Sequence, residues 1–403
     1  MRARQHFARI WILTLIAALG TVALFNRLVD PYALRDGPLF EGINTIKARP
    51  DRALSDIKLA QALRISPDAL ILGNSRADIG LDPAFPGLRA LARRPYNMAI
   101  PGAGMPTITA NLEALLAADR RPRLVIVGLE FLDYLNAAPA PRRPPAPRTA
   151  RDLDALHLQS LFTMAALGDS VSTLRAQHDP HAATIRSDGF NPLNDYTGIA
   201  AREGYGALFR QRALENVRRI RAHDWPADIR ATNEHAALAR LLELAREHGM
   251  RVELMTYPYH AHILGALRRE GLIDEFVAWK LAMADTVARA AQQGANVRLW
   301  DFSLVGEQMA EAVPDAGDRR SVTRWYWEGG HFKSALGDLM LARVLAPAGA
   351  APGIGYGRLM QPGESPADHT LAADIDTLLR DRPDIAHDID AAFEALERPA
   401  GGR

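Results

Sequence analysis

The chain of 403 residues contains no cysteine. A disulfide framework and a thiolate metal site are therefore excluded, although this absence does not fix the compartment. The chain also lacks an excess of either charge, since 48 basic and 47 acidic residues give a formal net charge of +1. That balance gives no indication of nucleic-acid binding. No internal repeat is apparent in the sequence.

Charged residues are also missing from Ile10 to Phe25, a run somewhat shorter than the roughly 20 residues that span a bilayer. Three arginines precede it, which favours a cytoplasmic N-terminus with the bulk of the chain outside. A cleaved signal peptide is the alternative, but Thr21-Val22-Ala23 is a poor cleavage site. We therefore predict that residues 1–28 form a single membrane anchor.

Short apolar runs alternate with helical periodicity in the remaining chain, which predicts an α/β fold with a doubly wound parallel sheet. The run LVIVGL is typical of a parallel strand that is covered on both faces. The five predicted strands are Ala69–Leu72, Tyr96–Ile100, Leu124–Leu129, Val252–Thr256 and Val297–Asp301.

A candidate nucleophile follows the first of these strands, in Gly73-Asn74-Ser75-Arg76. Ligands of open parallel sheets bind beyond the C-terminal ends of the strands, and a serine there needs a base to become reactive. Glu328 and His331 are three residues apart, so a single turn can direct both at one site. Taken alone, the first motif is also common turn chemistry, and Glu-x-x-His also occurs on surface helices. Their occurrence at opposite ends of the alternating region favours a shared site.

These motifs resemble those of the SGNH superfamily of esterases and acyltransferases. The similar branch is membrane-anchored and includes alginate O-acetylation proteins and the D-alanyl-lipoteichoic acid protein. Gly73–Arg76 fits the nucleophile block, Tyr96–Gly102 fits the second block, and Glu328-x-x-His331 fits the last, which usually reads Asp-x-x-His. The resemblance covers roughly residues 28 to 345 and implies a flavodoxin-like, five-stranded sheet.

The sequence predicts that the chain has three parts. The anchor is followed by an α/β domain at residues 29–345, with a partly helical insertion around 150–225. Residues 346–403 lie outside the resemblance and are predicted to form an acidic helical appendage, with a partly disordered arm as the alternative. A basic, proline-rich stretch at 137–149 is predicted to be a surface loop, with a flap over an anionic polymer as the alternative.

In the chemistry that the resemblance implies, Ser75 attacks an ester carbonyl and His331 accepts its proton, while Glu328 orients the imidazole. The backbone N–H groups of Ser75 and Gly102 are the candidate oxyanion donors, with Asn97 as a candidate side-chain donor. This chemistry requires no cofactor and no metal.

The third block departs from the superfamily, which often has Gly-x-Asn-Asp where this chain has Gly128-Leu129-Glu130-Phe131. An ionised Glu130 cannot stabilise an oxyanion. Three alternatives stay open: Asn97 or Asn74 donates instead, the oxyanion hole is weaker, or Glu130 points elsewhere. Acyl transfer or lost activity are therefore alternatives to efficient hydrolysis.

Other polar and aromatic residues near the predicted site are candidates for substrate contact. Tyr259 and His260 follow the fourth strand, and Arg76 could hold an anionic group or serve as an ion-pair partner. His260 and His262 have a spacing found in metal sites, but no acidic or cysteine partner is evident, so no metal is predicted. Trp325 and Trp327 could stack on a sugar or pack beneath the histidine loop.

The sequence thus predicts an enzyme of the bacterial inner membrane with its catalytic domain in the periplasm. It would transfer or remove an acyl group, with acetyl favoured, on a cell-envelope polysaccharide or another acylated polymer, and a membrane-bound O-acyltransferase is the candidate partner. The alternatives are a catalytically silent scaffold of an envelope-polymer modification complex and a soluble esterase released by cleavage near Ala23.

Overall fold

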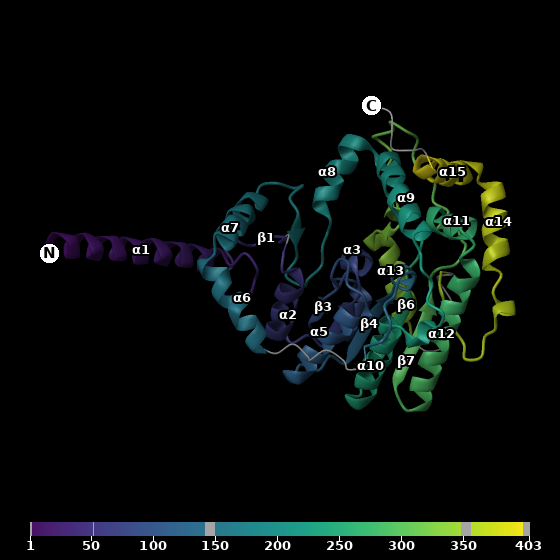
Figure 1. Ribbon diagram of the computed structural model, residues 1–403, viewed down its shortest axis with the longest axis horizontal. Helices are drawn as coiled ribbons and strands as arrows, with labels where there is room; N and C mark the ends of the chain where they lie inside the picture. Colours follow the sequence, from purple (N-terminus) through teal and green to yellow (C-terminus); the bar gives the residue numbers. More distant parts are fainter. Residues whose placement is uncertain (1, 51, 142–149, 348–355, 398–403) are drawn as a thin grey trace.

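The computed structural model describes residues 2–50, 52–141, 150–347 and 356–397. It begins with helix α1 (Arg2–Val29), which projects away from the body of the molecule (Figure 1). Among the described residues, α1 is the one helix that is long and apolar enough to cross a membrane. The prediction of one N-terminal apolar helix is confirmed. The helix extends well beyond the uncharged run on both sides.

Within the described residues, six strands form the central sheet, in the order β10-β7-β6-β4-β2-β3. Neighbouring strands from β3 to β7 are parallel, and β10 is antiparallel to β7. All residues of β2 and β4 are buried, as expected for parallel strands covered on both faces. The strands are β2 (Ala69–Leu72), β3 (Pro95–Asn97), β4 (Leu124–Leu129), β6 (Arg251–Thr256), β7 (Asn296–Asp301) and β10 (Arg358–Leu359).

The mixed α/β fold with a mainly parallel sheet is therefore confirmed, and each of the five predicted strands is present. The predicted strand count was wrong, because β10 adds a sixth strand. It comes from the C-terminal segment that was predicted to lie outside the domain. A strand of two residues is too short to leave a period-two pattern in the sequence.

Helices connect the strands and pack against the sheet. The leucines of α10 recur at the spacing of one helix face, and Leu238, Leu241 and Leu242 are all buried. The connecting helices are α2 (Leu54–Ile65), α3 (Ser75–Gly80), α4 (Pro86–Leu91), α5 (Met105–Ala117), α10 (Asn233–Glu247), α11 (Ala261–Arg269), α12 (Ile273–Gln292) and α13 (Ser334–Leu345).

The insertion between β4 and α10 has two halves with different neighbours. In the first half, α6 (Ala150–Phe162) and α7 (Met164–Ala176) contact α1, and β5 (Thr184–Ile185) pairs with β1 (Lys47–Ala48). The second half contains α8 (Asn194–Glu203) and α9 (Tyr205–Arg221). Helix α9 contacts the hairpin that carries His331.

The C-terminal segment forms α14 (Leu371–Asp381) and α15 (Pro383–Glu397), where the sequence predicts acidic helix. α15 packs against α9 and α11, and its apolar face is buried through Ile385, Ile389 and Phe393. Part of the proline-rich stretch, residues 142–149, lies outside the described residues.

Candidate active site

The Ser75 hydroxyl stands at the C-terminal end of a buried strand. β2 ends at Leu72, and Ser75 is the first residue of α3. The Asn74 side chain caps this helix, since its oxygen accepts the N–H of Arg76 at 3.0 Å. Ser75 is half-buried while the residues on either side of it are buried. The strand and the cap together present the hydroxyl at the sheet edge, as predicted.

A buried tyrosine supports the turn from beneath. The hydroxyl of Tyr257 accepts the N–H of Asn74 at 3.2 Å. Gly73 leaves the space for it, because a Cβ there would lie 2.3 Å from the tyrosine oxygen. The sequence showed this tyrosine beyond the fourth strand but gave no sign of its role. The support is formed only when β2 and β6 are assembled into the sheet.

The acid and the base lie opposite each other on a two-stranded hairpin. Glu328 ends β8 (Tyr326–Glu328), and His331 begins β9 (His331–Phe332). Gly329 and Gly330 form the two-residue connection between these strands. The Glu-x-x-His spacing therefore arises from a hairpin turn, so the alternative of a surface helix does not apply.

The hairpin and the serine turn meet although they are 256 positions apart. The Ser75 Oγ lies 2.8 Å from Nε2 of His331, and Nδ1 of His331 is hydrogen-bonded to Oε1 of Glu328. A carboxylate on Nδ1 keeps the proton there and leaves Nε2 free to accept the serine proton. The three groups therefore have the geometry of an acyl-transfer triad.

The environment of Glu328 favours its charged form. Burial opposes ionisation, but the neighbouring imidazole and the hydrogen bonds from His331 and Gly330 outweigh it, so the pKa of Glu328 lies below its ordinary value. The Gly330 N–H donates to Oε2 of this carboxylate at 2.8 Å. A buried anion in this position can orient the imidazole and stabilise the imidazolium.

Glu130, which departs from the pattern of the superfamily that the motifs resemble, forms an ion pair with Arg76, and both side chains are buried. The Glu130 carboxylate also accepts hydrogen bonds from Asn74 Nδ2 at 3.1 Å and from the Leu132 N–H at 3.0 Å, as well as from the Tyr259 hydroxyl. Its negative charge is therefore matched by a buried cation and several donors. These contacts agree with the alternative in which the Glu130 carboxylate points away from the oxyanion.

Arg76 also joins the two halves of the site. Its Nε donates to the carbonyl oxygen of Gly330 at 2.6 Å. Arg76, which follows Ser75, is therefore bonded to Gly330, which precedes His331. The sequence left open whether Arg76 was an anion ligand or an ion-pair partner, and the structure gives it the second role.

Asn97 is occupied elsewhere and cannot serve as an oxyanion donor in this arrangement. Its amide group donates to the carbonyl oxygens of Ala77 at 2.8 Å and Leu81 at 2.9 Å, and its oxygen accepts the Ala99 N–H. The prediction for Asn97 was wrong, because its side chain joins the second block to α3.

Two backbone donors remain candidates for the oxyanion hole. The Ser75 N–H is at a helix start, where no intrahelical acceptor is available. Gly102 has φ of +74°, a conformation that glycine adopts readily, and it lies on an exposed loop. The Ile100 N–H ties this loop to the Gly73 carbonyl at 3.0 Å, so the loop lies beside the nucleophile turn.

The three candidate substrate-contact residues are buried, which contradicts a direct contact with substrate for Tyr259 and His260, while the buried ion pair of Arg76 agrees with its alternative role. Arg76, Tyr259 and His260 have exposed fractions of 5%, 1% and 0%. His260 caps α11 and bonds to the carbonyl oxygen of Glu311, and burial lowers its pKa well below the ordinary value. Within the described part of the chain, no group of acidic, histidine or cysteine residues could hold a metal ion.

An aromatic wall lies beside the hairpin. Trp327 immediately precedes Glu328 and is half-buried. Its ring stacks on Tyr205 with centroids 6.2 Å apart, and Tyr196 meets it edge-on. The insertion therefore reaches the triad through α8 and α9. Packing was one of the two roles that the sequence left open for Trp327, and these ring contacts agree with it. The side chain also retains some exposed surface.

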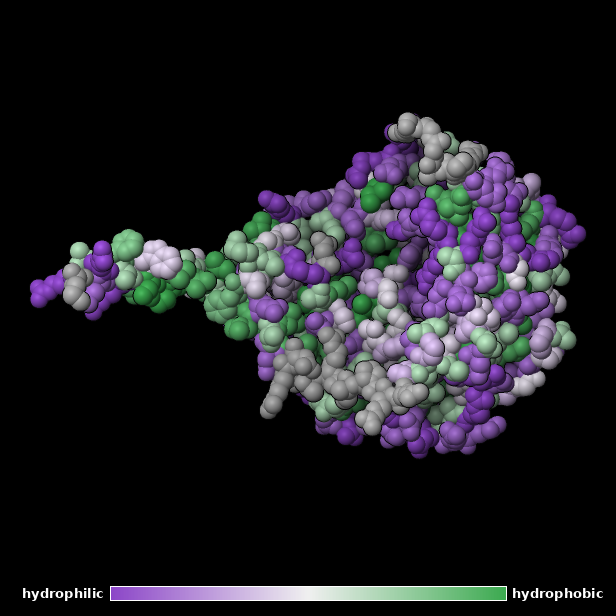
Figure 2. Space-filling view, in the orientation of Figure 1, coloured by the Kyte–Doolittle hydropathy of each residue, from purple (hydrophilic) through white to green (hydrophobic). Residues whose placement is uncertain are grey.

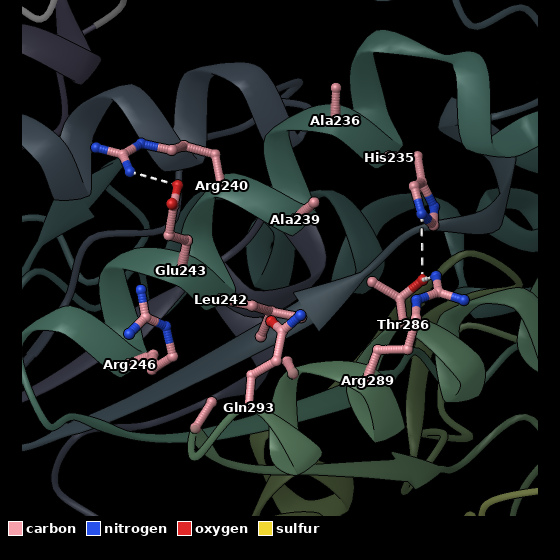
Figure 3. A pocket seen from close by; sticks show the side chains of 12 residues that line it. His235, Ala236, Ala239, Arg240, Leu242, Glu243, Arg246, Thr286, Arg289 and Gln293 are labelled. Atoms are coloured by element: carbon pink, nitrogen blue, oxygen red, sulfur yellow. Dashed lines mark hydrogen bonds and ion pairs between the residues drawn. The ribbon is translucent and has the colours of Figure 1, made fainter.

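A separate hollow of about 470 Å³ lies between α10 and α12 (Figure 3). Its lining includes His235, Arg240 and Arg289, and none of the predicted site residues is among the residues that line it. The triad is therefore a separate feature of the molecule.

Comparison with protein-family models, with curated proteins and with solved structures finds no match for this chain. The functional assignment therefore depends on the residues and their geometry.

Proposed function

We propose that the protein is a membrane-anchored serine esterase or O-acyltransferase. The observation that carries this proposal is the chain of contacts from Ser75 through His331 to Glu328. The imidazole removes the proton as the serine oxygen attacks an ester carbonyl, and an acyl-enzyme and an alcohol result. Water or an acceptor hydroxyl then takes the acyl group from Ser75.

The strand order supports the predicted fold family. Numbered along the chain, the five parallel strands have the order 2-1-3-4-5, which is the order of flavodoxin-like, doubly wound sheets. Ser75 follows the first strand, where this order places a ligand-binding crevice. We take this arrangement, together with the resemblance in the motifs, to be SGNH-like.

For the substrate, we propose an acyl group, with acetyl favoured, on a cell-envelope polysaccharide or related acylated polymer. The partly exposed Trp327 supports a sugar-containing substrate, because aromatic faces suit sugar rings. The apolar helix α1 supports single-pass anchoring, and the arginines before it favour a body on the periplasmic side of the inner membrane. A membrane-bound O-acyltransferase is the proposed source of acyl groups.

The proposal is tested with the full chain in detergent and p-nitrophenyl acetate as substrate. Ser75→Ala and His331→Ala should each abolish turnover, while circular dichroism shows a retained fold. The matched control is Ser321→Ala, which removes an exposed hydroxyl from the loop before β8. Equal turnover in all four proteins would overturn the assignment.

A silent scaffold remains the second candidate, and one observation favours it. Asn97 donates both of its amide hydrogens to backbone carbonyls, so the oxyanion would depend on backbone N–H groups. A fold-competent protein without turnover on any acetylated sugar would support the scaffold.

A further inference from the structure

The end of α1 is fixed rigidly to the body. Asn26 is fully buried, and its side chain donates to the Leu161 carbonyl at 2.9 Å and accepts from the Ser170 hydroxyl at 2.8 Å. The carbonyl oxygens of Leu28 and Val29 accept hydrogen bonds from Asn44 and Lys47. The helix therefore does not swivel freely on a linker. If α1 crosses a bilayer, the surface around its base must face that bilayer.

Several large apolar side chains are exposed on the surface around the base of α1. The segment 39–46 exposes Leu39 at 66%, Phe40 at 44% and Ile43 at 42%. On the α6–α7 side, Leu158 is 62% and Met164 76% exposed. Hydrophobic surface continues from α1 onto the adjoining body (Figure 2). Water-exposed apolar patches of this kind mark interaction sites.

A cleft of about 610 Å³ opens at the same place, and cations predominate in its lining. Two of its arginines are already paired, Arg35 with Asp30 and Arg64 with Asp36. Arg27 and Lys47 form no ion pair with any described residue. Lys47 is 6% exposed, and its ammonium donates to the Val29 carbonyl at 2.9 Å, which leaves two of its three N–H groups for a ligand.

We propose that this surface docks on the bilayer, with the apolar side chains in the interface and an anionic phospholipid headgroup in the cleft beside Arg27 and Lys47. Exposed apolar side chains around a cationic cleft match the chemistry of such a lipid, whose phosphate lies between its acyl chains and water. The proposal rests on membrane insertion of α1 and is independent of the chemistry at Ser75.

Docking would also fix the orientation of the active site. Because α1 is bonded to α6 and α7, and α8 and α9 of the same insertion flank Trp327, the triad would be held at a constant height above the membrane. A fixed distance between the triad and the membrane suits a partner that is itself embedded in the bilayer.

The absence of cysteine allows a direct test with single cysteines in the full chain. A fluorophore is attached to Phe40→Cys or Met164→Cys, and the protein is reconstituted in vesicles that contain brominated phosphatidylcholine or brominated phosphatidylglycerol. Leu15→Cys reports on the anchor. Ala373→Cys, exposed on α14 at the end of the molecule opposite α1 (Figure 1), is the reference in water.

Quenching at positions 15, 40 and 164 but not at 373 is the expected result, with stronger quenching by phosphatidylglycerol. Lys47→Gln and Arg27→Gln should each lower that lipid preference about fivefold, since a cation at a membrane surface contributes about 1 kcal/mol. Arg121→Gln, which removes an exposed cation elsewhere, should leave it unchanged.

Quenching at 15 without quenching at 40 and 164 would overturn the docking while leaving the anchor intact. Equal quenching at 40 by both lipids would overturn the headgroup site. The absence of quenching at position 15 would show that α1 does not enter the bilayer, and it would overturn the proposal. None of these outcomes depends on esterase turnover.

Discussion

The Nε atom of Arg76 lies 2.6 Å from the carbonyl oxygen of Gly330. This contact joins the residue after the candidate nucleophile to the residue before the candidate base. Because the same guanidinium is paired with Glu130, one buried arginine fixes both the turn after β2 and the hairpin of β8 and β9. Several measurable consequences depend on this arrangement.

Replacement of Arg76 by lysine should lower kcat with little change in KM. Lysine keeps the charge beside Glu130 but cannot reproduce the fork that reaches Gly330. A small displacement of the hairpin can lower the rate about 100-fold. Steady-state kinetics with p-nitrophenyl acetate measure both constants. A purely structural role would instead lower the amount of folded enzyme, which titration of active sites would show.

Replacement of Arg76 by methionine should reduce the free energy of unfolding by about 3–5 kcal/mol, because it leaves the Glu130 carboxylate buried without its cation. The double variant Arg76→Met/Glu130→Gln should recover part of that loss. Chemical denaturation in detergent, followed by tryptophan fluorescence, gives the free energies of unfolding of the unsubstituted protein, of Arg76→Met, of Glu130→Gln and of the double variant. Additive losses in the double variant would contradict the pairing.

Replacement of Glu328 by glutamine should lower kcat about 10³–10⁴-fold while the fold is kept. An amide can direct its N–H at Nδ1 of His331, which stabilises the wrong tautomer and places a proton on Nε2. Glu328→Asp restores the carboxylate and should recover part of the rate. Glu243→Gln, an exposed change on α10, should have no effect. A rate for Glu328→Gln equal to that control would exclude the orienting role.

Removing one partner of the ion pair between Lys58 and Asp78 should cost far more stability than removing one partner of a surface pair. Both of its side chains are buried, and Lys58 also donates to the Ala99 carbonyl at 2.7 Å beneath α3. Lys58→Met leaves a buried carboxylate and should cost about 3–5 kcal/mol. Arg121→Met breaks an exposed pair and should cost less than about 1 kcal/mol. Similar losses in the two variants would contradict the difference in burial.

The pH dependence of stability should carry a contribution from Glu234. Burial raises the pKa of Glu234 to about 7, although the hydrogen bond from the Met105 N–H opposes this. Between its unfolded pKa, near 4.5, and 7 the folded state keeps a proton that the unfolded state releases. Rising pH therefore weakens the fold over this range, and the loss is constant above it.

Glu234→Gln removes that dependence, since its amide oxygen can still accept the Met105 N–H. The melting temperature of the variant relative to the unsubstituted protein should therefore be higher at pH 8 than at pH 5. An identical difference at both pH values would show that the carboxyl does not titrate in this range. The exposed Glu243→Gln serves as the control.

The sequence predicted β2 and β4 well because each is a run of buried apolar residues next to a turn. It also predicted that Ser75, Glu328 and His331 share one site, and the structure brings their side chains together. It failed for Asn97, Tyr259 and His260. Their roles depend on burial and on partners distant in sequence, such as Ala77 for Asn97, which periodicity does not encode.

The sixth strand and the attachment of α1 escaped prediction for related reasons. β10 has two residues and acquires its identity only by pairing with β7. Asn26 looks like the polar end of a membrane segment, but its side chain is buried between α6 and α7. Such contacts arise from tertiary packing, which overrides local preference.

The most direct test of the central claim is covalent labelling of the full chain with a fluorophosphonate probe, followed by peptide mass spectrometry. An activated serine beside an imidazole should react, so the account predicts modification of Ser75 that is lost in His331→Ala. An unmodified Ser75 in folded protein, under conditions that label a known serine esterase, would contradict it.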